Sequence, residues 1–114
     1  MMLHTVILMN ALNIWNMQKD DKEIVYNHLL NVNDIEYNLT KTAEEMQELA
    51  LILIQKNNKP NQISDEKIIE EIGDVIIRLK VLKKQYPKEL ITERINYKLN
   101  KFFTYIKEKK YKNI

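Results

Sequence analysis

The 114-residue sequence contains no cysteine, which excludes disulfide bonds and thiolate metal ligands and fits a reducing compartment. It has one glycine and two prolines, too few for the turns of a β-sheet protein. Its two histidines, His4 and His28, do not stand in the Glu-x-x-His pairs that helical di-iron proteins use. These shortages predict an all-α protein and argue against a ferritin-like iron site.

The beginning of the chain lacks the pattern of a targeting segment. Residues 2–9 are mostly apolar, but no basic residue precedes them as one would in a secretory signal. Asn10, Asn13 and Asn16 make the stretch too polar to span a membrane. We therefore expect a cytoplasmic protein without a membrane segment.

The net charge of +2 is unevenly distributed. Residues 34–74 hold ten acidic residues and four lysines, a net charge of −6, whereas residues 88–114 hold eight basic and three acidic residues, a net charge of +5. An acidic middle followed by a basic end suits a site that holds a cation together with a polyphosphate. A nucleic-acid binder ranks last among the function classes, because the acidic middle would repel a phosphate backbone.

Hydrophobic periodicity and helix-stop residues predict four or five helices in a single domain spanning residues 1–114. Within it we distinguish N-terminal helices of unclear role (1–33), a core (34–104) and a basic tail (105–114). The expected helices are 3–18, 21–30 capped by Asp21, 35–56 capped by Asp34, one from a cap at Ser64 or Asp65 to Tyr86, and one with Pro87 in its first turn.

Two acidic pairs are the most informative feature of the sequence. Glu45 and Glu48 stand three residues apart, and so do Glu71 and Asp74 after a gap of twenty-two residues. On a helix each pair projects to one side. Both pairs lie about a dozen residues from the loop around Pro60, so at about 1.5 Å per residue they reach the same height on neighbouring antiparallel helices. Surface acidic stripes are the alternative, but they do not require this match.

The acidic pairs also resemble a known motif, EExxE followed by a spacer and ExxD. It marks the all-α nucleoside triphosphate pyrophosphohydrolases, which include MazG proteins, dimeric dUTPases, dCTP pyrophosphatases and phosphoribosyl-ATP pyrophosphohydrolase. Here the motif spans residues 44–48 and 71–75, with Gly73 directly before the aspartate. A basic, asparagine-containing stretch follows at residues 94–102. The resemblance covers roughly residues 34 to 104.

This resemblance implies a MazG-like helical bundle, dimeric, that cleaves a nucleoside triphosphate to the monophosphate and pyrophosphate. It implies Mg²⁺ as the cofactor, with Mn²⁺ as a second choice, because both prefer oxygen ligands. The metal ligands would be Glu45, Glu48, Glu71 and Asp74, with Glu48 as the base that activates water. The substrate-binding residues would be Asn96, Lys98 and Lys101, although an ordinary solvated cationic face is an equal alternative for that stretch.

Four points stay open at this stage. A non-catalytic helical dimerisation module is the second function class, and dependence on Mg²⁺ would distinguish it from an enzyme. The aliphatic runs 49–54 and 75–82 look too apolar to be covered within a single chain, so we expect a homodimer or a higher homo-oligomer. Gly73 costs about 1 kcal/mol in a helix relative to alanine, which indicates either a close approach of another group or simple tolerance. The preferred base and sugar cannot be read from the sequence.

Overall fold

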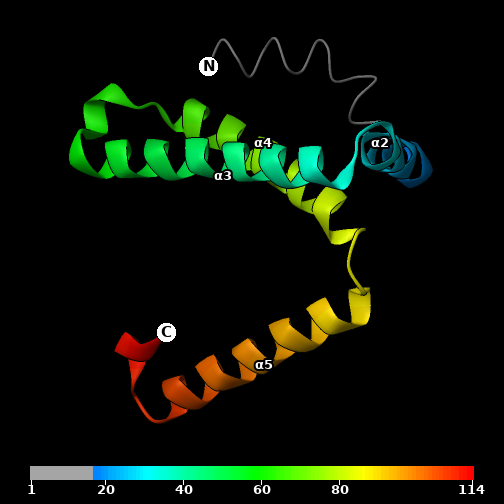
Figure 1. Ribbon diagram of the computed structural model, residues 1–114. Coiled ribbons are helices and arrows are strands. Elements are labelled where there is room, and N and C mark those ends of the chain that lie inside the picture. The colour runs from blue at the N-terminus through cyan, green and yellow to red at the C-terminus, as the bar shows by residue number, and fades with distance from the viewer. Residues whose placement is uncertain (1–16) are drawn as a thin grey trace. The chain divides into compact units, whose positions relative to one another are not determined.

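The computed structural model describes residues 17–114, and all regular secondary structure in this part of the chain is helical (Figure 1). The elements are α2 (Lys19–Val32), α3 (Ile35–Asn58), α4 (Asp65–Lys83) and α5 (Lys88–Lys107), with short 3₁₀ helices η1 (Pro60–Gln62) and η2 (Tyr111–Asn113). The all-α prediction is therefore confirmed. The expected helix at 3–18 lies almost entirely outside the described residues.

The two expected caps of the central helices are present. Asp34 Oδ1 accepts a hydrogen bond of 2.8 Å from the backbone N–H of Tyr37, at the start of α3. Ser64 Oγ accepts one of 3.2 Å from the backbone N–H of Lys67, so the cap of α4 is Ser64 rather than Asp65. Each bond satisfies one of the N–H groups that a helix start leaves without an intrahelical partner.

Five predicted helix boundaries are wrong by a few residues. The helices predicted at 21–30 and 35–56 end later, at Val32 and Asn58. Helix α2 begins at Lys19, which places Asp21 in its first turn, where a carboxylate is favoured by the helix dipole, and not at its cap. Helix α4 ends at Lys83 instead of Tyr86, whose N–H bonds the Lys83 carbonyl at 3.2 Å in a turn. Pro87 precedes the first helical residue of α5 and caps it, with φ −60° and ψ 121°. An extended conformation at or just before proline is the usual one.

The described chain forms two compact units, which divide at the end of α4 between Leu82 and Lys83. In the first unit the chain reverses direction between α3 and α4 (Figure 1). Lys56 organises this reversal, because its Nζ donates to the carbonyls of Pro60 (3.2 Å) and Ile63 (2.8 Å) and lies 3.4 Å from Asp65 Oδ1. The predicted loop around Pro60 is thus a 3₁₀ turn held by a lysine of the preceding helix.

Buried residues of the first unit are few and largely polar. Among the described residues, the buried apolar ones are Val75 and Val81, while Asn38, Thr42 and Glu71 are buried polar ones. Thr42 Oγ1 donates to the Asn38 carbonyl at 2.7 Å, and Asn38 Nδ2 donates to the Leu30 carbonyl of α2 at 3.4 Å. A polar seam therefore runs along the buried side of α3.

The aliphatic runs are only partly covered within this single chain. Leu51, Leu53 and Ile54 are exposed in the run 49–54, and Ile76 and Ile77 in the run 75–82, where Val75 and Val81 are buried. The expectation that one chain would not cover these runs agrees with this exposure. No helix in the described part of the chain is both long and apolar enough to cross a membrane.

Candidate metal centre

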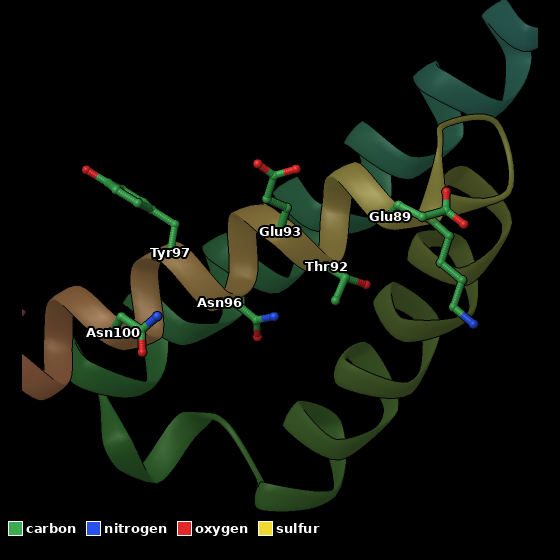
Figure 2. Close-up of a pocket in the computed structure, with 7 residues that line it drawn as sticks. Glu89, Thr92, Glu93, Asn96, Tyr97 and Asn100 are labelled. Carbon is green, nitrogen blue, oxygen red and sulfur yellow. The ribbon is translucent and has the colours of Figure 1, made fainter.

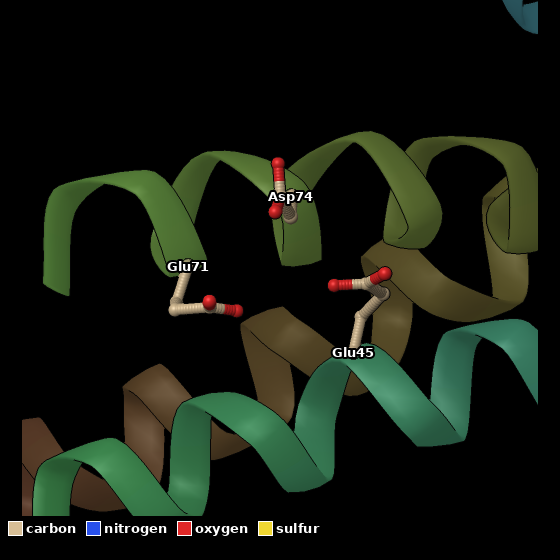
Figure 3. A group of neighbouring side chains, drawn as sticks. All are labelled: Glu45, Glu71 and Asp74. Atoms are coloured by element: carbon tan, nitrogen blue, oxygen red, sulfur yellow. The ribbon is translucent and has the colours of Figure 1, made fainter. Parts of the chain in front are cut away.

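Three carboxylates from two helices converge in the first unit (Figure 3). Glu45 of α3 and Glu71 and Asp74 of α4 each contribute one oxygen atom, and these three atoms lie within 4.8 Å of one another. The i, i+3 spacing places Glu71 and Asp74 on one side of α4, and the chain reversal brings Glu45 opposite them. Three of the four carboxylates predicted as metal ligands thus come together.

Two lysines balance part of the negative charge. Lys67 Nζ lies 3.0 Å from Glu71 Oε1, and Lys41 Nζ lies 3.6 Å from Glu45 Oε1. Each lysine precedes its glutamate by four residues, one helical turn away. The hydrogen bond and the charge of Glu71 raise the pKa of Lys67 above its usual value, so this lysine stays protonated. One oxygen of each glutamate is therefore satisfied within its own helix.

The other oxygen of each glutamate has no partner. Glu71 is only 5% exposed, and the buried Oε2 atoms of Glu71 and Glu45 form no hydrogen bond. Burying a carboxylate oxygen without a partner costs about 1–3 kcal/mol or more for a charged group. A bound cation would remove this cost, and carboxylate oxygens are the ligands that Mg²⁺ and Mn²⁺ prefer. The donor set and the two unsatisfied atoms fit a divalent metal ion.

Glu48, the fourth predicted ligand, lies beside this cluster and is exposed. Its pKa is raised, chiefly by the charge of Glu45, then by desolvation and by the charge of Glu71, while the charge of Lys41 lowers it. Glu48 therefore interacts electrostatically with both helices of the cluster, although its oxygens do not belong to the triad formed by the other three.

The raised pKa of Glu48 predicts a specific pH dependence in the presence of chelator. The folded protein binds the proton of the Glu48 carboxyl more tightly than the unfolded chain does. This proton therefore stabilises the fold at a pH below the usual pKa of glutamate, and the stabilisation is lost as the pH rises through the raised pKa of the folded state. Stability of the cation-free protein should fall over this window, and Glu48→Gln should remove that part of the fall. Denaturant unfolding across the acidic to neutral range measures it, with Glu70→Gln as the control. If the free energy of unfolding depends on pH in the same way in the wild type and in Glu48→Gln, the prediction is contradicted.

The predicted substrate-binding residues lie on α5, in the second unit. Asn96 lines an open depression on this helix together with Glu89, Thr92, Glu93, Tyr97 and Asn100 (Figure 2). Lys98 and Lys101 do not line it, since they follow Asn96 at different angles around the helix, with Lys98 about 200° away. The structure does not bring the asparagine and the lysines together on one face.

The two lysines rest instead against aromatic rings one turn further along α5. Lys98 Nζ is 5.0 Å from the centre of the Phe102 ring, and Lys101 Nζ is 5.9 Å from that of Tyr105. Such cation–π contacts at exposed positions are worth about 0.5–1 kcal/mol, which is less than a charge-assisted hydrogen bond to a phosphate. The role of these lysines in substrate binding stays a prediction.

Sequence reasoning missed the pairing of Lys41 and Lys67 with the cluster, although the Lys-x-x-x-Glu spacing of both pairs is visible in the sequence. For Gly73 the sequence left two explanations open, a close approach of another group to the helix backbone and simple tolerance of glycine. A Cβ atom at Gly73 would meet no other atom within 4 Å, so within this chain the tolerance of glycine is the better explanation.

Comparison of the chain with protein-family models, curated proteins and solved structures finds no match.

Proposed function

We propose that this protein is a Mg²⁺-dependent nucleoside triphosphate pyrophosphohydrolase of the MazG-like, all-α type. The observation that carries the proposal is the convergence of Glu45, Glu71 and Asp74 from two helices, with a buried, unsatisfied oxygen on each glutamate. The acidic pairs that resemble those of the pyrophosphohydrolases supply these same residues. Surface acidic stripes would not leave carboxylate oxygens buried without partners.

The roles of the carboxylates follow from their positions. Glu45, Glu71 and Asp74 would hold Mg²⁺, with Glu48 as a fourth ligand or as the base. The bound ion would supply positive charge that offsets the negative charge developing on the leaving pyrophosphate. Glu48 is exposed and has a raised pKa, two properties that suit a group taking a proton from water.

The reaction then needs one attacking water and one leaving group. Glu48 removes a proton from the water while the oxygen atom of the water forms a bond to the α-phosphorus. The bond between that phosphorus and the bridging oxygen of the β-phosphate breaks, and pyrophosphate leaves. The products are a nucleoside monophosphate and pyrophosphate. Asn96, Lys98 and Lys101 are the proposed substrate contacts, with the lysines acting on phosphate as point charges.

A screen of the common ribo- and deoxyribonucleoside triphosphates tests this proposal. We expect at least one of them to release pyrophosphate and the corresponding monophosphate in the presence of Mg²⁺ or Mn²⁺, and none to do so in chelator. Release of inorganic phosphate instead of pyrophosphate would contradict the assigned bond cleavage. Absence of any metal-dependent hydrolysis across the whole set would contradict the enzymatic function.

A non-catalytic helical dimerisation module is the alternative function. It is favoured by the exposed aliphatic side chains of α3 and α4, such as Leu51, Ile54, Ile69 and Ile76. A second copy of the chain that packed on these faces would bury them, and a homodimer is also what the enzymatic proposal expects. The two functions differ in their need for a cation, because an interaction module gains little from Mg²⁺.

A further inference from the structure

Arg78 follows the acidic cluster by one helical turn on α4. Glu71, Asp74 and Arg78 are spaced i, i+3 and i+7, so they share one face of the helix within an arc of about 60°. The Nη1 atom of Arg78 is buried and has no hydrogen-bond partner. In the described chain, no ion pair links Arg78 to Asp74 or to another carboxylate.

A buried guanidinium donor without a partner, on a residue one helical turn from a cluster of carboxylates, is unusual. Lys41 and Lys67, the lysines nearest the cluster in sequence, are already paired with Glu45 and Glu71. Arg78 stands four residues after Asp74, a spacing that permits an ion pair, and yet its buried donor is not used. Leaving a buried charged donor without an acceptor is costly, which indicates that the acceptor comes from a bound group.

An anion that accompanies the cation is the acceptor with the best chemical match. A planar guanidinium group can donate two parallel hydrogen bonds to phosphate oxygens. It also keeps its positive charge throughout the pH range in which proteins are folded. A metal ion held by Glu45, Glu71 and Asp74 would place the phosphate oxygens it binds next to this face of α4. A donor here would meet those oxygens without displacing either lysine from its glutamate.

We propose that Arg78 binds the phosphate group that lies beside the cation, namely the pyrophosphate portion of the substrate. For the identity of the anion this inference rests on the proposed function. The first unit of the chain then carries both charges that a metal–polyphosphate complex requires: carboxylates for the cation and an arginine for the anion. The contact does not depend on Lys98 or Lys101 of α5.

The test measures binding of Mg²⁺ and of inorganic pyrophosphate to the full chain by calorimetry, with pyrophosphate titrated at saturating Mg²⁺. Arg78→Met should weaken pyrophosphate binding by roughly ten- to a hundredfold, the range expected for one charge-assisted hydrogen bond. Arg78→Lys should recover part of this loss because it restores the charge. Lys83→Met, a matched change at an exposed position of the same helix, should have no effect.

Melting without ligand separates this role from a structural one. Because Nη1 has no partner in the ligand-free chain, Arg78→Met should leave the melting temperature unchanged or raise it. Three results for Arg78→Met would each overturn the inference. They are a marked fall in the melting temperature without ligand, an unchanged affinity for pyrophosphate, and a loss of Mg²⁺ affinity as large as the loss of pyrophosphate affinity. If the wild type binds Mg²⁺ but not pyrophosphate, the inference fails while the metal site stands; if it binds neither, the proposed function fails as well.

Discussion

Replacing Glu48 with glutamine is expected to lower turnover of the accepted nucleotide by about a hundredfold or more, the range associated with loss of a general base. Glutamine keeps the size and the hydrogen-bonding capacity of the side chain, but it cannot take a proton from water. The measurement is the rate of pyrophosphate release at saturating nucleotide and Mg²⁺. The KM should change less than kcat, because the lost interaction belongs to the chemical step.

Glu70→Gln is the matched control for this experiment. Glu70 is acidic and exposed, and it directly precedes Glu71, yet it projects about 100° away around α4. Its replacement removes the same charge from the same region and should leave the rate nearly intact. Equal losses in Glu48→Gln and Glu70→Gln would mean that overall negative charge, and not a defined set of carboxylates, supports the activity.

The elements of the fold that depend on local sequence could be predicted. Asp34 and Ser64 cap their helices through hydrogen bonds to residues three positions ahead, and Pro60 and Pro87 lie in the connections between the α-helices, where proline is tolerated. Contacts that depend on the fold could not be predicted. Lys56 closes the turn before α4 by reaching carbonyls four and seven residues away, and nothing in the pattern singles it out from other lysines.

The exposure of the aliphatic runs illustrates a second limit. Leu51, Ile54 and Ile76 have the spacing and character of core residues, but they lie on the outside of the single chain. Hydrophobic periodicity indicates which face of a helix needs to be covered, but not which group covers it. For this reason the sequence supports a prediction of self-association and leaves the geometry of the partner undefined.

For the candidate site, spacing predicted that the carboxylates would lie at the same height on neighbouring helices, and three of the four lie close together. Equal distances from the loop were enough to bring Glu45, Glu71 and Asp74 together. The set Asn96, Lys98 and Lys101 was drawn from one short stretch, and a rotation of 100° per residue separates its members around α5. The unpaired state of Arg78 could not be foreseen, since the spacing from Asp74 predicts an ion pair that the structure does not form.

Mg²⁺ is expected to raise the melting temperature of the protein by about 10 °C when its concentration exceeds the dissociation constant a hundredfold. Preferential binding to the folded state then contributes about 2.7 kcal/mol, and each 1 kcal/mol raises the midpoint by roughly 4 °C for a chain of this size. The physical source would be the positive charge supplied to Glu45 and Glu71, whose buried Oε2 atoms have no partner. Thermal melting in Mg²⁺ and in chelator measures the difference.

Glu71→Gln should abolish most of this stabilisation, because it replaces the most deeply buried carboxylate of the cluster by a neutral amide. Glu70→Gln, which removes an exposed charge from the adjacent position, should melt with the same dependence on Mg²⁺ as the wild type. The comparison isolates a defined site from general screening of an acidic surface, since screening would act on both variants alike. Equal melting temperatures of the wild type in millimolar Mg²⁺ and in chelator would argue against a metal site, and with it against hydrolysis that depends on these carboxylates.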